Sequence, residues 1–584
     1  MLRSDFRTVL LAGGLCLGLA ACGVDQREPG EAAASNRAEA APIARIDWFE
    51  YEGRDEVFQG VSPGPDEYLN PILAGFYPDP SITQVGGDYY LVNSTFCYFP
   101  GIPVFHSSDL VNWTQIGNVI DRPGMLDFDG LGLSRGVFAP TIEHHDGTFY
   151  VANTCVDCGG NFVVTAEDPA GPWSDPIWLP EVGGIDPSLF FDGDGKVYVI
   201  NNDAPPEGST YDGHRAIWMR EVDPETLQSI SEPIVLLDGG VRPEEQPIWI
   251  EGPHIYKVGD WYYLSAAEGG TAINHSQVVL RASSVTGPYE PYEDNPILTQ
   301  RHLDPARENP ITSVGHADFV TDDAGNWWVS FLGVRPYEGD YYNTGRETFL
   351  MPVRWEDGWP VIAKGQEQVP YVVSPRPVLP AGEPGAYRMS GNFTVREEFD
   401  GESLPFHWMF LRVPETQWFA LEEGALTLEA RPVSLGSGGQ PSYLGRRQQH
   451  LDALATMALD FAPQAAGDEA GLAVLQSDEY YYRIGVHMTE ANGSEIQVRV
   501  RAGADAPEDG EAIAFGPLGD EFDGKVELRI TAKRDLYDFE YRLPDGEWKM
   551  MASDQDGTLL STAVATGFVG ATFGPYAQRA GEGG

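Results

Sequence analysis

The chain has 584 residues, which at roughly 100–200 residues per domain gives about three domains or two large ones. Its 37 basic and 88 acidic side chains leave a formal net charge of −51, so the surface repels phosphate backbones and anionic lipid headgroups. The charge excludes nucleic acid as a partner and favours an uncharged ligand. The 67 glycines, 45 prolines and many aromatic residues are typical of short strands joined by tight turns.

The N-terminal residues have the features of an export signal. Arg3 and Arg7 precede an apolar run over residues 9–21, which is too short to span a bilayer but has the length of a signal-peptide core. The run ends in Leu-Ala-Ala-Cys at 19–22, which resembles the lipobox of bacterial lipoproteins. We therefore expect cleavage of residues 1–21 and lipidation of Cys22, with an ordinary signal peptide as the alternative. Export would place the protein at the outer membrane, in the periplasm or at the cell surface, with the lipid anchor as its only membrane contact.

Three cysteines follow the predicted anchor, namely Cys97, Cys155 and Cys158. Export exposes them to an oxidising compartment, where at least one thiol of three stays unpaired. Cys155 and Cys158 form a single CxxC without the second ligand pair of a structural zinc site or the βαβ pattern of a thioredoxin site. A local disulfide and two free thiols both remain open.

A repeated pattern determines the predicted architecture. Residues 22–65 are predicted to be a tether and entry segment, because their first part is rich in Ala and Glu without strand alternation. A turn followed by an aromatic strand then recurs five times, and its copies start 60, 48, 64 and 66 residues apart. The turn glycines are Gly87, Gly147, Gly195, Gly259 and Gly325. This spacing leaves room for four short strands per copy, so residues 66–365 are predicted to form a five-bladed β-propeller.

An equivalent segment lies upstream of each of these turns. Its lead residue is 8 or 9 positions before the turn glycine in every copy. The lead residues are Asp79, Ala139, Asp186, Glu251 and His316. The segment is predicted to be the innermost strand of each blade, since it precedes a hairpin turn and the aromatic strand. Because equivalent positions lie on a ring around the axis, we expect the five side chains to converge on one central pit.

A second domain follows a proline-rich linker predicted over residues 366–394. Alternating apolar segments at 425–430 and 526–531, with hairpin signals at Asp509-Gly510 and Asp545-Gly546, predict a two-sheet β-sandwich over residues 395–580. Helix signals are nearly absent, so the predicted fold class is all-β.

Three of the expected ring residues, Asp79, Asp186 and Glu251, are carboxylates. Their convergence would be costly, because desolvation and mutual repulsion raise at least one pKa. Asp before Pro also begins turns, which is the structural alternative for Asp79 or Asp186 taken singly. Separated carboxylates serve glycoside hydrolysis, in which one acid protonates the leaving oxygen and another, roughly 6.5–9.5 Å away, deprotonates water.

Five motifs, in this order, resemble glycoside hydrolase family 43, in its branch of β-xylosidases and α-L-arabinofuranosidases with an appended sandwich domain. They are Gly-Phe-Tyr-Pro-Asp-Pro-Ser-Ile at 75–82, Gly-Ile-Asp-Pro-Ser-Leu-Phe-Phe at 184–191, Glu-Gly-Pro-His-Ile-Tyr-Lys at 251–257, Gly-His-Ala-Asp at 315–318 and Gly-Arg-Glu-Thr-Phe-Leu-Met-Pro-Val-Arg-Trp at 345–355. The resemblance covers residues 70–578 and implies a five-bladed propeller, a concanavalin-like sandwich, and exo-cleavage of pentose units with inversion. It also implies that Asp79 is the general base, that Glu251 is the general acid, and that Asp186 orients Glu251 and keeps its pKa high.

The resemblance further implies residues that bind the sugar. Arg346 matches an arginine that contacts sugar hydroxyls, with a surface salt bridge as the alternative, and Phe96 matches an aromatic wall, with core packing as the alternative. His316 matches an axial position that in the family sometimes lies beneath a calcium ion or ordered water. No cofactor is expected to be required, and at His316 a structural calcium, a water site and a satisfied core histidine all remain open.

The sequence also departs from the family pattern. Phe138 stands where the branch commonly has Trp, so the pocket would lose an indole N–H while keeping an aromatic face. Phe568 is predicted to narrow the pocket from the sandwich domain, and a passive stabilising domain is the alternative. The three cysteines are predicted to line the pocket rim, where thiol reagents would slow turnover.

We therefore predict an exported, lipid-anchored β-xylosidase that acts on oligosaccharides and releases terminal xylose with inversion. An α-L-arabinofuranosidase acting on arabinoxylan or arabinan fragments is the alternative within the family, and a non-catalytic surface glycan-binding lipoprotein is the alternative from another class. The Asn-Asp-Pro-Asn nucleophile motif of fructan-cleaving relatives is missing. The sequence predicts no oligomeric state.

Overall fold

The computed structural model describes residues 41–379, 382, 385 and 387–581. The predicted signal peptide and Cys22 lie outside these residues. Within the described chain the only α-helix is α1 (Thr562–Ala565), and the 3-10 helices are η1 (Glu56–Phe58), η2 (Pro243–Glu245) and η3 (Gly557–Leu560). None of these helices is long and apolar enough to cross a membrane. The remaining elements are strands, which confirms the all-β prediction.

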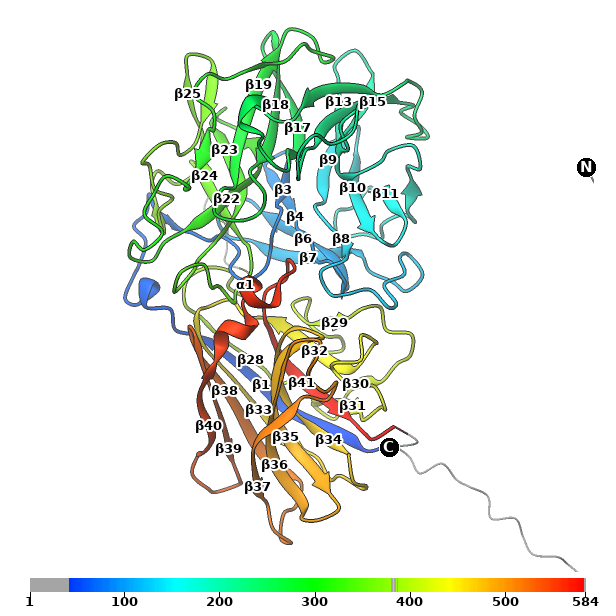
Figure 1. Ribbon diagram of the computed structural model, residues 1–584, viewed down its shortest axis with the longest axis vertical. Coiled ribbons are helices and arrows are strands. Elements are labelled where there is room, and N and C mark those ends of the chain that lie inside the picture. Colours follow the sequence, from blue (N-terminus) through cyan, green and yellow to red (C-terminus); the bar gives the residue numbers. More distant parts are fainter. Residues whose placement is uncertain (1–40, 380–381, 383–384, 386, 582–584) are drawn as a thin grey trace, which may run out of the picture. The chain divides into compact units, whose positions relative to one another are not determined.

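Five small antiparallel sheets form the propeller (Figure 1). The first sheet contains β3 (Ser81–Val85), β4 (Asp88–Val92), β6 (Gly101–Ser107) and β7 (Thr114–Ile120). The second contains β8 (Gly136–Val137), β9 (Thr141–His145), β10 (Thr148–Val156), β11 (Gly160–Ala166) and β12 (Ile177–Trp178). The third is β13 (Ile185–Phe191), β14 (Val197–Asp203), β15 (Ala216–Val222), β16 (Ile234–Asp238). The fourth contains β17 (Glu251–Val258), β18 (Trp261–Glu268), β19 (Ser276–Ala282), β20 (Glu290–Pro291) and β21 (Leu298–Thr299). The fifth contains β22 (Thr312–Thr321), β23 (Trp327–Val334) and β24 (Glu347–Pro352).

The first strands of neighbouring blades pack against one another in the cyclic order β3, β9, β13, β17, β22 and back to β3. A second contact also closes the ring between the start and the end of the propeller segment. Leu73, which precedes the first blade, exchanges backbone hydrogen bonds with Thr348 of β24 in the fifth blade. Two short ribbons lie outside the blades, formed by β2 (Tyr68–Leu69) with β27 (Val372–Val373) and by β25 (Arg354–Glu356) with β26 (Trp359–Val361).

The inner strands share a backbone feature at their start. Asp79, Asp186 and His316 are left-handed, with φ of 53°, 55° and 52°. In the fourth blade this position is Gly252, with φ of 54°. Glu251 therefore lies one residue before the position that the repeat spacing predicted for it. The hairpin registers agree with this shift, because Val85 pairs with Asp88 in the first blade and Val258 pairs with Trp261 in the fourth.

The sandwich consists of two sheets, as predicted. One contains β30 (Phe419–Glu422), β31 (Ala425–Glu429), β1 (Ile43–Gly53), β33 (Asp452–Asp460), β38 (Lys525–Lys533), β39 (Leu536–Arg542), β40 (Lys549–Asp556) and, beside β1, β28 (Thr394–Glu397). The other contains β37 (Glu511–Pro517), β36 (Gly493–Ala502), β35 (Tyr480–Thr489), β34 (Glu469–Ser477), β41 (Thr572–Gln578), β32 (Ser442–Arg447), β29 (Met409–Leu411) and β5 (Tyr98–Phe99).

Strand β1 corrects the predicted domain boundaries. Residues 43–53 were predicted to belong to the tether and entry segment, but they form a strand of the sandwich that pairs with β28, β31 and β33. The pairing register shifts between Ile46 and Trp48, which breaks the two-residue alternation that identifies a half-buried strand in a sequence. Its partners also lie more than 300 residues away along the chain, so no local pattern connects them.

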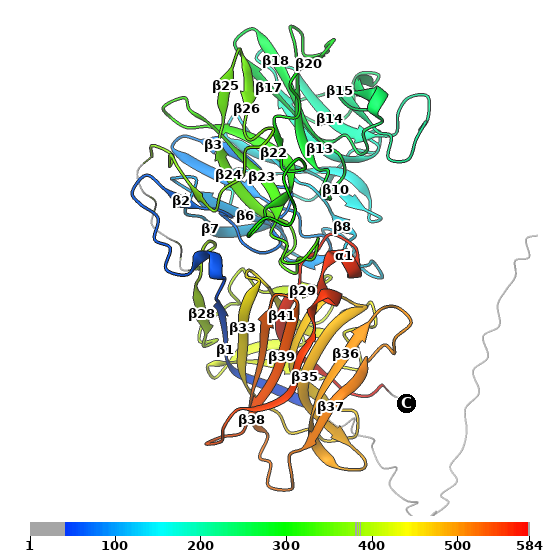
Figure 2. The same cartoon turned by 60° about the vertical axis from the view of Figure 1, so that its left-hand side comes forward.

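The propeller and the sandwich share elements. Strand β5 lies within the propeller segment of the sequence but extends a sandwich sheet through β29. In the other direction, the segment that carries η3 and α1 reaches the propeller near β8 (Figure 2). There the backbone N–H of Phe568 donates to Ser134 Oγ at 2.8 Å. Buried Arg335 of the fifth blade also connects the two parts, since it pairs with Glu347 and Asp55 and donates to the Gln449 carbonyl.

Candidate active site

One cavity of about 520 Å³ lies where the inner strands begin, a volume within the usual range for small-molecule sites. The eight residues predicted to act in catalysis or sugar binding all line it. They are Asp79, Phe96, Phe138, Asp186, Glu251, His316, Arg346 and Phe568. The ring geometry therefore brings together residues that are separated by almost 490 positions in the sequence.

Asp79 is held as an anion. Arg346 donates to both of its carboxylate oxygens, at 3.0 and 3.4 Å, and Ser94 Oγ donates to Oδ2 at 2.6 Å. Burial alone would raise the pKa of Asp79, but the guanidinium charge and these hydrogen bonds hold it below its ordinary value. Arg346 is thus a buried partner of this carboxylate, not part of a surface salt bridge.

Asp186 and Glu251 have the opposite setting. Burial raises the pKa of Glu251 well above its ordinary value, and the nearby carboxylates of Asp186 and Asp79 raise it further. Burial and the charge of Asp79 also raise the pKa of Asp186, against a hydrogen bond that its Oδ2 accepts from the Gly252 N–H at 3.1 Å. The cavity therefore contains one carboxylate whose surroundings favour the ionised form, Asp79, and two whose surroundings favour the protonated form, Asp186 and Glu251.

Local backbone geometry explains how the carboxylates enter the cavity. Asp79 and Asp186 each occupy a left-handed position immediately before a proline, and left-handed backbone is uncommon outside glycine. In the fourth blade glycine is required at this position, because a Cβ on Gly252 would lie 2.8 Å from the His316 ring. Glu251 enters from the preceding residue, and its longer side chain extends into the same cavity.

Three phenylalanines form an aromatic wall. Phe96 and Phe568 stack with ring centroids 5.9 Å apart, and Phe138 meets each of them edge to face at 5.6 Å. The Arg346 guanidinium lies 5.4 Å from the Phe568 ring centroid. Phe568 comes from the sandwich, so this domain contributes directly to the cavity wall. Apolar ring faces of this kind pack against the C–H faces of a sugar.

His316 lies in the cavity, and its calcium or water site remains a prediction. Burial lowers the pKa of His316 and of neighbouring His275 to about 4, so both rings are neutral at neutral pH. His275 Nδ1 bonds to the Ser313 carbonyl oxygen, and its buried Nε2 has no partner among the described residues. Calcium prefers several oxygen ligands, whereas the described chain contains no cluster of three or more His, Cys, Asp or Glu arranged to hold a metal. These residues do not fit a calcium site made by the protein alone.

The sequence did not identify every cavity residue. Arg135, Ile248 and the loop Gly269–Ala272 also line the cavity, and they lie outside the repeated motifs. Trp249, two residues before Glu251, adds an aromatic ring to the lining. The Arg215 guanidinium covers the Trp249 ring at 4.3 Å from its centroid. Arg135 and Ile248 lie three residues before Phe138 and Glu251, respectively. This closeness in sequence to predicted site residues was the only signal that could have identified them.

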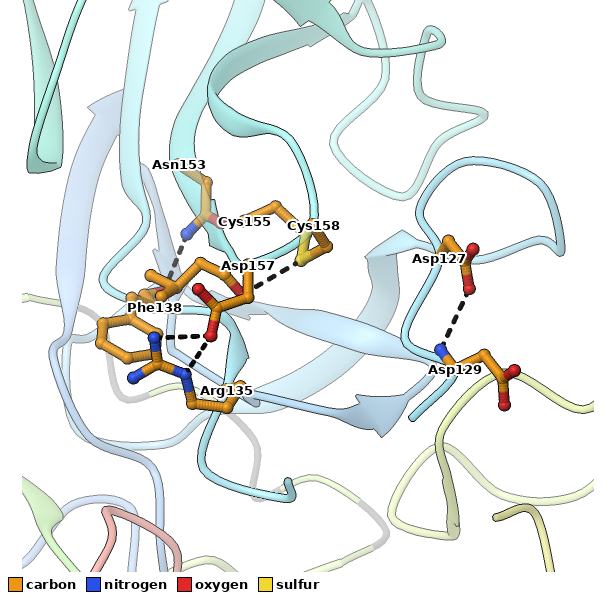
Figure 3. The surroundings of a disulfide bond; sticks show 9 residues. Asp127, Asp129, Arg135, Phe138, Asn153, Cys155, Asp157 and Cys158 are labelled. Atoms are coloured by element: carbon orange, nitrogen blue, oxygen red, sulfur yellow. Dashed lines mark hydrogen bonds and ion pairs between the residues drawn. A yellow bond between two sulfur atoms is a disulfide. The ribbon is translucent and has the colours of Figure 1, made fainter. Parts of the chain in front are cut away.

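The predicted thiol rim is wrong. Cys155 and Cys158 form a disulfide (Figure 3), and Cys97 is buried. None of the three lines the cavity. Cys97 Sγ lies in the core beneath Gly136, where burial raises the pKa of the thiol to about 12 and suppresses the thiolate that reagents attack.

Comparisons with known proteins agree with this geometry. The family model described as glycosyl hydrolases family 43 matches residues 68–360, and the one described as beta xylosidase C-terminal concanavalin A-like domain matches residues 396–584. A xylosidase/arabinosidase of Butyrivibrio fibrisolvens is 38% identical over 519 residues, which cover 88% of this chain and 96% of the relative. A non-reducing end alpha-L-arabinofuranosidase of Bacteroides ovatus is 38% identical over 539 residues, covering 89% and 93%.

A crystal structure of a GH43_12 protein from capybara gut metagenome superposes with a TM-score of 0.85 at 39% identity, covering 92% of this chain and all of that one. The fold, the converging carboxylates and these matches all lead to one assignment. The chain is a glycoside hydrolase, and it belongs to glycosyl hydrolases family 43.

Proposed function

We propose that the protein is an exo-acting, inverting β-xylosidase that releases terminal xylose from xylo-oligosaccharides. The observation that carries this proposal is one cavity that holds two carboxylates with opposite pKa shifts, Asp79, whose pKa is lowered, and Glu251, whose pKa is raised. An inverting glycosidase needs this pair, a base for the water and an acid for the leaving oxygen. The xylosidase names of several relatives support the choice of sugar.

In the proposed reaction, Asp79 accepts a proton from a water molecule as its oxygen attacks the anomeric carbon. Glu251 donates its proton to the glycosidic oxygen as the bond between that oxygen and the anomeric carbon breaks. The products are free xylose with inverted anomeric configuration and an oligosaccharide one unit shorter. Solvent then removes the proton from Asp79 and returns one to Glu251. Each group starts in the required protonation state because its surroundings shift its pKa in the required direction.

Asp186 and Arg346 would act through these two groups. The Asp186 carboxylate adds negative charge near Glu251 and favours its protonated form. Arg346 holds Asp79 by two hydrogen bonds and fixes the direction of its oxygens toward the water. Since Arg346 also lines the cavity, its planar guanidinium can reach hydroxyls of the bound sugar.

A second candidate within the family is α-L-arabinofuranosidase, favoured by the name of the Bacteroides ovatus relative. The test is the ratio of kcat/KM for 4-nitrophenyl β-D-xylopyranoside to that for 4-nitrophenyl α-L-arabinofuranoside, together with the products formed from xylotriose. A ratio above one, with xylose and xylobiose as first products, supports the β-xylosidase. A ratio below one supports the arabinofuranosidase, and sugar binding without hydrolysis of any substrate would support a non-catalytic binding protein.

We also propose that the protein is exported and anchored through a lipid on Cys22. The support is the sequence alone, a short apolar run that ends in Leu-Ala-Ala-Cys. Expression of the full chain in a bacterium with labelled palmitate provides the test. The wild type should incorporate label and fractionate with membranes, and Cys22→Ala should do neither. Equal behaviour of the two proteins would contradict the anchor.

A further inference from the structure

We propose that Arg135 is a specificity-determining residue that binds the leaving-group sugar, and that the turn closed by the Cys155–Cys158 disulfide positions it through Asp157. The inference rests on the proposed exo-hydrolysis and names how the same cavity recognises the part of the oligosaccharide that departs. It follows from the position of Arg135 in the cavity, its ion pair and the connections of the turn.

The exposure of the lining residues orders the cavity from floor to mouth. Asp79, Asp186 and Glu251 are only 4–7% exposed, whereas the side chain of Arg135 is 43% exposed and Ile248 is 40% exposed. The terminal sugar must reach the carboxylates at the floor to react. The rest of the oligosaccharide therefore extends to the mouth, where Arg135 lies.

Arg135 is available to donate hydrogen bonds there. Its Nε donates to Asp157 Oδ2 at 2.7 Å, and its Nη2 lies 2.7 Å from the same oxygen (Figure 3). Within the described chain its Nη1 makes no hydrogen bond. The ion pair orients the guanidinium beside Phe138, with Cζ 5.9 Å from the ring centroid. A guanidinium N–H next to an aromatic face offers a sugar both a donor for its hydroxyls and a surface for its C–H groups.

The disulfide closes the turn that carries Asp157. Cys155 and Cys158 are three residues apart, and Asp157 lies between them with a left-handed φ of 66°. Cys155 pairs with Gly160 across the β10–β11 hairpin and with Val137 of β8. Strand β8 directly connects Arg135 to Phe138. Strand β10, which carries Cys155, therefore contacts the residues next to Arg135 through its backbone, and Asp157 contacts Arg135 itself through its side chain.

The same strand also fixes the backbone of Phe138. The Phe138 N–H donates to the Thr154 carbonyl, and Asn153 Nδ2 donates to the Phe138 carbonyl at 2.7 Å. Strand β10 therefore holds both ends of β8, including the two cavity-lining residues that flank it. Opening the disulfide would loosen the turn at the end of this strand.

An exposed ion pair usually contributes little, because ordering two long side chains offsets the attraction and solvent screens it. Asp157 has a short side chain on a turn that the disulfide already closes, so little conformational freedom remains to be lost on that side. The consequence is positional: Arg135 is oriented before substrate binds, and preorganised groups bind with a smaller entropic cost.

The test compares two substrates of the same enzyme. Xylotriose has a hydroxyl-bearing leaving group, whereas 4-nitrophenyl β-D-xyloside has a flat leaving group without sugar hydroxyls. We expect Arg135→Gln to lower the ratio of kcat/KM for xylotriose to that for the aryl xyloside about tenfold, the value of one hydrogen bond to a charged group. The loss should appear mainly in KM for xylotriose, and Arg135→Lys should restore part of it.

Two further variants test the positioning role. Asp157→Asn and the double variant Cys155→Ser/Cys158→Ser should each lower the same ratio about threefold, less than the removal of Arg135 itself. Asp157→Asn retains the disulfide, so it remains informative if the double variant fails to fold. The matched control is Arg122→Gln, because Arg122 is 39% exposed, pairs with Asp175 and lies outside the cavity. The control should not change the ratio.

An unchanged ratio in Arg135→Gln would overturn the leaving-group site. A lowered ratio in Arg135→Gln with unchanged ratios in Asp157→Asn and the folded double variant would overturn the positioning role of the turn. Both outcomes require a wild type that hydrolyses the two substrates. A wild type that hydrolyses neither would instead contradict the proposed function, so the two failures are distinguishable.

Discussion

Replacement of Glu251 by Gln tests the assigned general acid in a way that mere loss of activity does not. The side chain is 7% exposed, and burial together with the charges of Asp186 and Asp79 raises its pKa well above the ordinary value. Burial and these charges therefore favour the neutral, protonated form of Glu251. An amide of the same shape preserves that neutrality and the packing, but it cannot transfer a proton, so the variant should fold as the wild type does.

The expected magnitude depends on the leaving group. General acid catalysis contributes about 10²–10⁴ in rate, which corresponds to about 3–5.5 kcal/mol of transition-state stabilisation. Hydrolysis of xylobiose releases a poor leaving group and depends fully on general acid catalysis, so kcat for xylobiose should fall by about 10²–10⁴. A 2,4-dinitrophenyl β-D-xyloside leaves as a stable anion without protonation, so its kcat should change little. Asp79→Asn, the matched control, should lose activity on both substrates, because both reactions need the activated water.

The assay is kcat measured over a series of aryl β-D-xylosides whose phenols range from strongly to weakly acidic. For Glu251→Gln the logarithm of kcat should fall steeply as the phenol becomes less acidic, whereas the wild type should give a shallow line. A uniform loss across the series would contradict the reasoning, because it would mean that Glu251 acts in some way other than protonating the leaving oxygen. A wild-type slope in the variant would do the same.

Three other changes have outcomes fixed by the structure. Arg346→Met removes the cation that opposes the burial of Asp79, so the pKa of Asp79 should rise and the acidic limb of the kcat/KM–pH profile should move to higher pH. Phe568→Ala removes a cavity ring and should lower kcat/KM about tenfold, whereas Phe515→Ala, at an exposed sandwich position, should have no effect. Arg335→Met leaves two buried carboxylates without their cation and should lower the free energy of unfolding in urea by about 3–5 kcal/mol.

The sequence was sufficient for the propeller because its five copies share a local signal, a turn followed by an aromatic strand. Pseudo-symmetry then placed Asp79, Asp186 and His316 on one ring, and the structure shows them in equivalent left-handed conformations. The predicted ring position of Glu251 was wrong by one residue, because sequence spacing does not reveal which residue of the fourth blade takes the left-handed conformation. Gly252 takes it, since the His316 ring leaves no room for a Cβ.

Features that depend on contacts between distant segments were harder to predict. Strand β1 joins a sheet whose other strands begin after residue 393, and its internal register shift hides the alternation. The spacing of Cys155 and Cys158 allowed a disulfide, but their distance from the cavity depends on the direction of the β10–β11 turn, which composition does not determine. The opposite pKa shifts of Asp79 and Glu251 likewise depend on which carboxylate Arg346 contacts, and Arg346 lies 267 residues from Asp79.

The most direct measurement follows the anomeric configuration of the xylose released from xylobiose by proton magnetic resonance during the first minutes of reaction. The glycosidic bond of xylobiose is β, and a single displacement by a water that Asp79 activates inverts that centre. The initial product should therefore be α-xylose, with the β anomer appearing only as the sugar equilibrates in solution. Initial release of β-xylose, or no release of xylose at all, would contradict the assignment of Asp79 and Glu251 as the base and acid of an inverting xylosidase.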